Sequence, residues 1–308
     1  MQAGFFVTDI TAPVGTMQAG NYSPQFIQGF AGPLKVRAAV FEQDGKLYAF
    51  AGVDCCAIDK VTITGALDLV RQQAGIEFDG HIISASHTHS GAAVSSFFNL
   101  ELLRDADPAI VELLRDSPVP DPWYNDWVRR QLATALIMAH KRLEPCLLNM
   151  GKGNEDAMVF NRRFYLKDGR AYTHPGKMNP DIIEPAGPID PDVGILGAWR
   201  EDGSLIGCLL NYSCHGTTHG GHLTHADWYH YAEETLQKLF GAQIGTVILN
   251  GACGDITQVN NLSFSRDFGP EVSYKLGFRV ACEAAKQLVS APKHAYQVLT
   301  GSSCELGI

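Results

Sequence analysis

The stretch Ile82-Ile83-Ser84-Ala85-Ser86-His87-Thr88-His89-Ser90-Gly91 joins an apolar run to a pair of histidines. The run predicts a buried β-strand that ends just before the histidines. Residues two apart in an extended chain point to the same side, so His87 and His89 are expected to present their imidazoles together. Neutral imidazole is a common zinc ligand and a general base near neutral pH. The alternative is a pair of ordinary loop histidines.

A second histidine-rich loop follows another apolar run, residues 205–211. Four of the 11 histidines in the chain lie between positions 215 and 227. His215 follows its run as His87 follows the first, and two histidines at distant strand ends predict a metal site assembled by the tertiary structure. The loop offers four further candidate ligands: His219, His222, His225 and Asp227. The alternatives are a mobile surface loop for these histidines and a helix cap for the aspartate.

Two more loops carry candidate catalytic groups. Residues 250–258 follow an apolar run at 245–249, and Thr257 in this loop could place a hydroxyl beside a metal. Arg162 lies in Phe160-Asn161-Arg162-Arg163 and could hold an oxyanion or a carboxylate. Their alternatives are a turn threonine and a solvated arginine.

The periodicity of the chain predicts strands that alternate with helices. Asp44-Gly45 between residues 34–41 and 47–53 indicates a hairpin, and Asp59 at the start of the helical period of residues 59–74 indicates a helix cap. Further helices are expected at 107–115, 122–140, 227–240 and 271–289, and further strands at 145–150, 157–160, 193–200, 205–211 and 245–249. This order predicts an α/β fold, or a mixed α+β one, with a layered sheet core flanked by helices and the metal site at strand ends.

Three further expectations concern the exposure of particular segments and side chains. The Pro/Gly-rich residues 167–191 predict a surface lid or an inserted excursion. Trp127 falls at helical spacing with Leu132 and Leu136 and is expected in the core. Cys253 sits in an apolar run and is expected in the core as well.

Composition narrows the class of protein. With 308 residues, 45% hydrophobic, the chain can bury a sizeable core. A net charge of −9 argues against nucleic-acid binding. No apolar run reaches the roughly 18–20 residues of a transmembrane helix, and no signal peptide is recognisable at the N-terminus. The eight cysteines form no CxxC pair, which predicts reduced thiols and a cytoplasmic location.

Taken together, these motifs resemble the neutral/alkaline (non-lysosomal) ceramidase family. The order of the motifs matches that of the family, and the resemblance spans nearly the whole chain: Val7–Thr11, Gly32–Ala38, His87–Gly91, Asn161–Arg163, Asn211–Thr217 and Gly254–Thr257. The resemblance implies a zinc amidohydrolase of the kind that splits the N-acyl amide of ceramide. It implies that His87 and His215 bind Zn²⁺, and that His89 and Arg162 line the site. Thr257 stands where the family has a serine implicated in catalysis.

The sequence departs from the family pattern at several points. Ala92 and Gln258 replace prolines, and Thr257 replaces the serine. The remaining zinc ligands of the family, a glutamate and a tyrosine, come from a later part of the chain and have no match before Ile308. We therefore expect residues 1–308 to form a single catalytic domain that lacks the C-terminal portion of the family. Otherwise, the second histidine-rich loop completes the metal shell.

The expected reaction is hydrolysis of a small-molecule or lipid-like amide. Hydroxide on Zn²⁺, or the Thr257 hydroxyl, would attack the carbonyl, while His89 moves the proton and Arg162 steadies the oxyanion. An apolar groove for the substrate could be rimmed by residues 167–191 together with Phe97, Phe98 and Leu100. The alternatives are a metal-dependent hydrolase of esters or phosphoesters, and a non-catalytic metal-binding relative.

Overall fold

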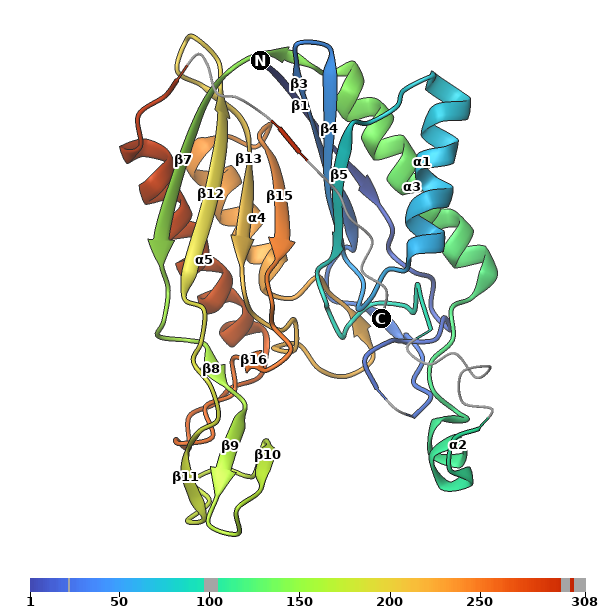
Figure 1. Ribbon diagram of the computed structural model, residues 1–308, viewed down its shortest axis with the longest axis vertical. Coiled ribbons are helices and arrows are strands. Elements are labelled where there is room, and N and C mark those ends of the chain that lie inside the picture. Colours follow the sequence, from blue (N-terminus) through green and yellow to red (C-terminus); the bar gives the residue numbers. More distant parts are fainter. Residues whose placement is uncertain (22, 97–104, 295–299, 302–308) are drawn as a thin grey trace.

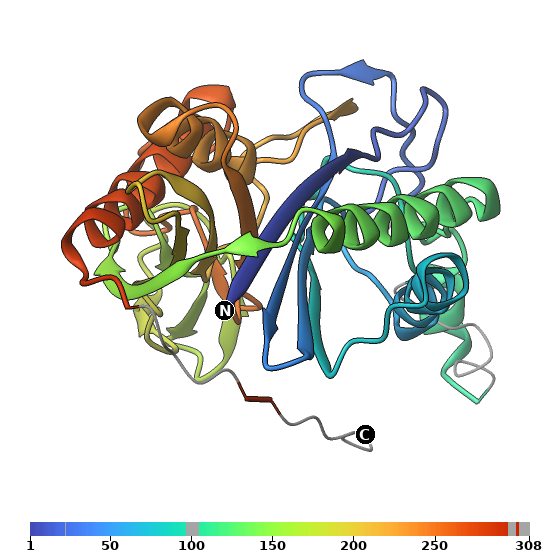
Figure 2. The ribbon, with the colours of Figure 1, turned by 90° about the horizontal axis from the view of Figure 1, so that it is seen from above.

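Two β-sheets pack face to face, and helices cover both outer faces, which gives four layers (Figures 1 and 2). The computed structural model describes residues 1–21, 23–96, 105–294 and 300–301. Phe97, Phe98 and Leu100 lie outside the described residues. The predicted α/β class, with mixed sheets flanked by helices, is confirmed.

The first sheet has the strand order β5-β4-β3-β1-β6. Its strands are β1 (Gln2–Asp9), β3 (Lys35–Gln43), β4 (Lys46–Val53), β5 (Gly80–Ala85) and β6 (Glu144–Pro145). Strands β1, β3 and β4 pair antiparallel, whereas β5 pairs parallel to β4. Its outer face is covered by α1 (Lys60–Ala74) and α3 (Pro122–Lys141), and the short helix α2 (Pro108–Leu114) precedes α3.

The second sheet has the strand order β15-β13-β12-β7. Its strands are β7 (Leu147–Asn154), β12 (Asp192–Trp199), β13 (Leu205–Tyr212) and β15 (Gly245–Asn250). Strands β7, β12 and β13 pair antiparallel, and β15 pairs parallel to β13. Its outer face is covered by α4 (Trp228–Phe240) and α5 (Pro270–Ser290).

The two halves share one topology. Each half has three antiparallel strands, a helix, a fourth strand parallel to the third, and a closing helix. The elements β1, β3, β4, α1, β5 and α3 thus correspond in order to β7, β12, β13, α4, β15 and α5. Corresponding strand ends are therefore expected to offer corresponding positions for side chains. Both parallel strand pairs direct their carboxyl ends toward the same end of the molecule (Figure 1).

Three layers of apolar side chains hold the sandwich together. One lies between the first sheet and α1 and α3, and another between the second sheet and α4 and α5. Between the sheets, Phe5 and Phe41 meet edge to face at 6.0 Å beside Val247. Burial of apolar surface at roughly 25 cal/mol per Å² makes these layers the main source of stability.

Local sequence features form as predicted. Asp44 and Gly45 both have positive φ in the β3–β4 turn, as a two-residue hairpin requires. The Asp59 carboxylate accepts a hydrogen bond from Thr62 N at the start of α1, and Gly75 ends that helix in the left-handed conformation.

Two expectations about burial are wrong. Trp127 is 39% exposed and stacks on the exposed Trp123 one turn earlier on α3. The helical spacing predicted that Trp127 shares the buried face of α3 with Leu132 and Leu136. The buried face of α3 is narrower than this spacing suggested, and Trp127 lies outside it. Cys253 is only half-buried, because it lies in the loop after β15 and not in the strand.

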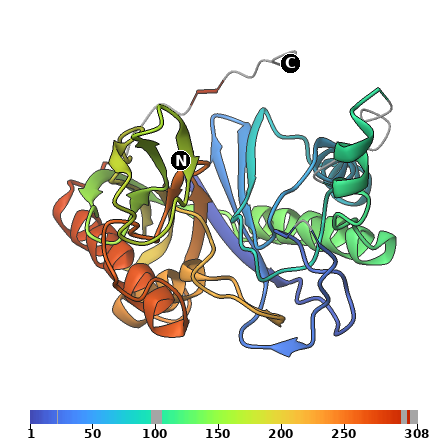
Figure 3. The same cartoon turned by 90° about the horizontal axis from the view of Figure 1, so that it is seen from below.

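Residues 167–191 belong to an excursion that projects beyond the sandwich (Figures 1 and 3). It is built on a small antiparallel sheet of β9 (Arg163–Leu166), β10 (Ala171–Thr173) and β11 (Ile182–Pro185). Its role as a lid stays a prediction. Two pairs of short strands lie near the same end: β2 (Gly29–Phe30) with β14 (Leu223–Thr224), and β8 (Phe160–Asn161) with β16 (Ile256–Thr257). No helix among the described residues has both the length and the apolar character needed to cross a bilayer.

Candidate metal centre

The two histidine-bearing segments meet where the parallel strands of both sheets end. His87 lies two residues beyond β5, and His215 lies three residues beyond β13. Thr88 and Gly216 form a parallel bridge, and His89 N donates to Gly216 O at 3.0 Å. A Cβ on Gly216 would lie only 2.9 Å from His87 O, so this approach requires glycine.

Three imidazoles converge at this junction. Nε2 of His87 lies 3.2 Å from Nε2 of His215 and 3.4 Å from Nε2 of His89. Two nitrogens bound to one tetrahedral zinc ion at about 2.0–2.1 Å would be roughly 3.3 Å apart. The structure therefore brings together the three histidines that the sequence singled out.

Hydrogen bonds orient the rings. His87 Nδ1 donates to Cys56 O at 2.7 Å, and His215 Nδ1 donates to Cys253 O at 2.6 Å. A carbonyl can only accept, so each Nδ1 carries the proton and each Nε2 keeps a free lone pair. Metal-binding histidines commonly have such a partner on the second nitrogen. The ring of His89 packs against Gly20, whose backbone also hydrogen-bonds it.

The surroundings keep these rings uncharged. Burial, which is the largest cause, acts together with the neighbouring imidazoles and the positive charge of Arg162 to lower the pKa of His89 to about 3 and that of His215 to about 4. Burial also lowers the pKa of His87. At neutral pH the lone pairs are thus available to a cation.

His87 and His89 come together for a different reason from the one expected. Strand β5 ends at Ala85, and His87 has φ = 62°, so the segment is not extended at this residue. The rings nevertheless lie 4.9 Å apart, nearly perpendicular. A histidine in the left-handed region is strained, and such strain is concentrated at functional sites.

Cys56 adds a ligand type that the sequence interpretation missed. Among the described residues, Cys56, His87 and His89 form the group of three whose ligand atoms all lie within 4.8 Å of one another. His215 does not lie within that limit of all three, although its Nε2 is next to that of His87. The available sequence clue was position: Cys56 lies three residues beyond β4, as His215 lies three beyond the corresponding β13.

Arg162 lies close enough to the three histidines for its charge to act on them. Its Nε and Nη2 donate to Gly254 O at 3.1 and 2.6 Å, and its charge lowers the pKa of all three imidazoles. Asn161 holds the same loop through a 2.8 Å hydrogen bond to the Asp255 carboxylate. Arg162 O accepts from His174 N, which borders a cavity of about 270 Å³. The cavity is lined by His174, Gly176, Lys177, Val259, Asn261 and Phe268.

Thr257 is buried in β16, next to Ile256, whose carbonyl also accepts from His215. Its hydroxyl donates to Gln258 Oε1 at 2.9 Å, and Thr217 donates to the same oxygen. The described hydrogen bonds of this hydroxyl include none to an imidazole. Gln258, which replaces a proline of the family pattern, therefore takes part in the loop packing.

The rest of the histidine-rich loop forms a second cluster. His219 and His225 stack with ring centroids 3.7 Å apart, and His230 lies 5.2 Å from His225. The Asp227 carboxylate caps α4 and accepts from Trp228 N, Thr218 Oγ1 and His219 N. The backbone carbonyl of His222 accepts a hydrogen bond from Gln28 N at 2.8 Å. Within the described residues, His219, His222, His225 and Asp227 are not part of the 4.8 Å ligand group.

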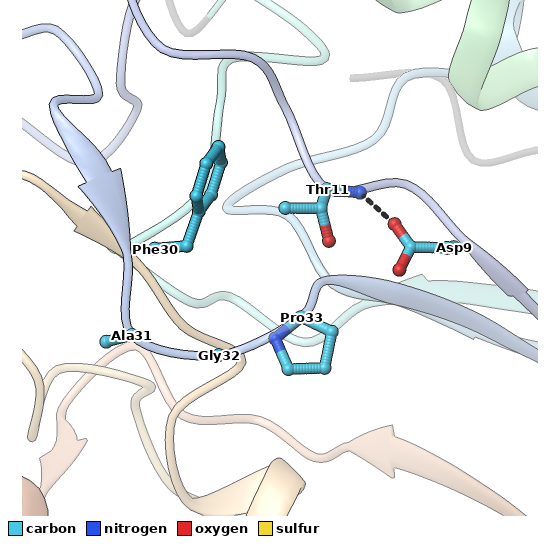
Figure 4. A pocket seen from close by; sticks show the side chains of 6 residues that line it. All are labelled: Asp9, Thr11, Phe30, Ala31, Gly32 and Pro33. Carbon is cyan, nitrogen blue, oxygen red and sulfur yellow. Dashed lines mark hydrogen bonds between the residues drawn. The ribbon is translucent and has the colours of Figure 1, made fainter.

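A further cavity of about 430 Å³ lies where β1 ends, beside the segment before β3 (Figure 4). It is lined by Asp9, Thr11, Phe30, Ala31, Gly32 and Pro33. Its carboxylate, Asp9, already accepts from Thr11 N at 2.7 Å. Gly32 packs on the ring of His225, so this cavity borders the second cluster and not the three converging imidazoles.

The donor set at the junction fits a zinc ion. Three neutral imidazoles with oriented rings and nitrogen spacings near the tetrahedral value are what zinc prefers, and a thiol lies within reach. Magnesium and calcium prefer oxygen ligands, and the ligand group contains no carboxylate among the described residues.

Solved structures with this fold include two ceramidases. One is a crystal structure of neutral ceramidase from Pseudomonas aeruginosa, and the other is a ceramidase complexed with C2. Each matches 94% of this chain with a TM-score of 0.72 at 21% identity. This chain spans 45% of the length of the first of these chains and 44% of the length of the second. No protein-family model matches the sequence, and no curated protein matches it. The chain therefore has a neutral ceramidase-like fold.

Proposed function

We propose that this protein is a zinc-dependent hydrolase of amide bonds, with the ion held by His87 and His215. The observation that carries the proposal is the 3.2 Å approach of the Nε2 atoms of His87 and His215. The Nδ1 of each ring donates its proton to a backbone carbonyl, so each Nε2 keeps a free lone pair. The similarity of the fold to that of neutral ceramidases supports the reaction class.

The zinc ion, when bound, would supply a Lewis acid and a water acidic enough to ionise near neutral pH. The neutral His89 ring, with its Nε2 3.4 Å from that of His87, would take a proton from the attacking oxygen and return it to the leaving amine. Arg162, fixed on Gly254 O, would place its charge against the developing oxyanion. The Thr257 hydroxyl remains a second candidate nucleophile.

The proposed substrate is a lipid-like or smaller N-acyl amide. The similar structures are ceramidases, and one of them is complexed with C2. The 270 Å³ cavity beyond Arg162 is our candidate for part of the acyl chain, because Val259 and Phe268 give it apolar walls. Val259→Trp should therefore lower kcat/KM for long acyl chains and leave N-acetyl substrates nearly unaffected. The cytoplasmic location stays a prediction, which cell fractionation would test.

The test is His215→Ala, with His81→Ala as the matched control because His81 is exposed on β5. Zinc content by mass spectrometry and hydrolysis of N-acyl amides should both be lost in the first variant and kept in the second. Full activity of zinc-free wild-type protein would overturn the proposal. Stoichiometric zinc without turnover of any amide, ester or phosphoester would favour the non-catalytic alternative.

A further inference from the structure

Asn250 lies at the end of β15, between the two segments that carry the histidines. Its Nδ2 donates to the carbonyl of Ser86, the residue before His87, at 3.3 Å. Its Oδ1 accepts from the backbone N of Cys214, the residue before His215, at 3.3 Å. One half-buried side chain thus joins the positions immediately before the two proposed metal ligands.

A third contact of this amide reaches the partner of the His215 ring. Asn250 Nδ2 lies 3.1 Å from Cys253 Sγ, and the carbonyl of Cys253 accepts the Nδ1 proton of His215. The two amide hydrogens thus have two acceptors, Ser86 O and Cys253 Sγ. These partners also fix the orientation of the amide, because Ser86 O can only accept and Cys214 N can only donate.

The contacts that follow the histidines complete the connection between the segments. Beyond the imidazoles, Thr88 forms a bridge with Gly216, and His89 N donates to Gly216 O. The Asn250 amide joins the same two segments before the imidazoles. One attachment alone would leave the segments free to pivot about it, whereas an attachment on each side fixes the 3.2 Å separation of the Nε2 atoms.

A role within its own sheet does not account for the Asn250 side chain. Strand β15 is held by backbone pairing to β13 along its whole length. The three contacts of the amide go instead to loop residues that lie beyond the strands of both halves. The next residue, Gly251, brings the loop close to the same segment, because a Cβ at this position would overlap Ser213 Oγ.

We propose that Asn250 is a positioning residue that holds His87 and His215 at the separation that one metal ion requires. This inference rests on the proposed metal site. Asn250 acts through the two histidines and does not itself bind the ion. Because its amide orders both segments before the ion arrives, less of the binding free energy is lost in ordering them.

Asn250→Ala tests this role, with Asn149→Ala as the matched control. Asn149 is a buried amide on β7 whose Nδ2 donates to Leu288 O and whose Oδ1 accepts from Trp199 Nε1. Both variants should lose stability in denaturant unfolding. Only Asn250→Ala should also lose zinc affinity, by about 10–100-fold, as for other partners that orient metal ligands. Competition with a chromophoric chelator measures the affinity.

Cobalt(II) gives a second readout, because its visible absorption bands depend on the arrangement of its ligands. The spectrum of cobalt-loaded Asn250→Ala should differ from that of the wild type, and the spectrum of Asn149→Ala should match it. Asn250→Ser has a side chain too short to reach both Ser86 and Cys214. It should show the same changes, and it replaces Asn250→Ala if that variant does not fold.

The outcomes separate this role from the proposed function. Wild-type zinc affinity and an unchanged cobalt spectrum in the Asn250 variants would overturn the positioning role and leave the proposed function standing. An equal loss of affinity in Asn149→Ala would also overturn it, because the loss would then follow from stability in general. Wild-type protein that binds neither zinc nor cobalt would overturn both proposals.

Discussion

At the scale of single residues, the candidate centre depends on how each imidazole uses its two nitrogens. Backbone carbonyls bind the Nδ1 protons of His87 and His215, and this leaves the Nε2 lone pairs directed at one another. Uncompensated lone pairs at 3.2 Å repel, and a shared cation would remove that repulsion. The strained backbone of His87 is consistent with a residue held for its chemistry.

The adjacent arginines allow a test of oxyanion stabilisation. Arg162→Ala should lower kcat for amide hydrolysis by about 10²–10³-fold, the usual cost of losing one oxyanion donor. Zinc content should stay unchanged, because the guanidinium is fixed on Gly254 O and is not one of the proposed metal ligands. Steady-state kinetics and metal analysis check both points. Arg163→Ala, at the exposed neighbouring position, is the control. Equal kcat in the two variants would contradict the role.

At the scale of elements, the β13–α4 loop carries the close contact on which the site depends. Gly216→Ala would place a Cβ 2.9 Å from both His87 O and Thr88 Cα, so the two histidine segments must separate. We expect zinc affinity to fall at least about tenfold, as for a displaced ligand shell. Gly220→Ala in the same loop is the control, because nothing lies within 4 Å of its Cβ position. Competition with a chromophoric chelator measures both variants. An unchanged affinity for Gly216→Ala would show that the contact is not needed.

The second histidine cluster is expected to make the stability of the fold sensitive to acid. Burial lowers the pKa of His225 from 6.5 to about 3 and also lowers those of His219 and His230. The unfolded chain therefore takes up these protons first, and the stabilisation present above pH 6.5 is lost as the pH falls toward 3. Asp227 opposes this between pH 6 and 3.8, because burial raises its pKa to about 6. Because three imidazoles destabilise the fold at low pH and one carboxyl opposes them, the free energy of unfolding should fall overall as the pH falls.

Urea unfolding of the metal-free protein between pH 7 and 4 measures this loss. Each proton taken up on unfolding contributes up to about 1.4 kcal/mol per pH unit. His225→Asn should flatten the profile, whereas His81→Asn, at an exposed site, should not. A profile for His225→Asn as steep as that of the wild type would contradict the assignment.

At the scale of the whole molecule, a buried ion network ties the two halves together. Arg37 on β3 binds Asp54 after β4 at 2.8 Å and Glu233 on α4 at 2.9 Å, and all three side chains are at most 2% exposed. Lys35 also reaches Glu233 at 3.0 Å. The first sheet and the helices of the second half thus share one set of charges close to the ends of the strands that carry the site.

Arg37→Met should lower the free energy of unfolding by about 3–5 kcal/mol, because it removes the cation that Asp54 and Glu233 share and leaves only Lys35 at Glu233. Lys152→Met is the control: it breaks the exposed pair with Asp192 and should cost less than about 1 kcal/mol. Denaturant unfolding at neutral pH compares the two. Similar losses of stability in both variants would show that the buried network contributes no more to stability than an exposed ion pair.

The sequence alone determined what depends on neighbours along the chain. The helix cap at Asp59, the hairpin at Asp44-Gly45 and the order of strands and helices follow from local preferences and apolar periodicity. The histidines of the candidate centre could also be named, since each follows an apolar run that ends as a strand.

Only the tertiary structure decided what depends on distant contacts. It placed Cys56 beside His87, directed the remaining loop histidines into a second cluster, and exposed Trp127. It also showed that a left-handed His87, and not strand alternation, brings the first two rings together. Spacing along a chain specifies which side chains follow a strand, but the packing of two sheets specifies which of those strand ends share one point in space.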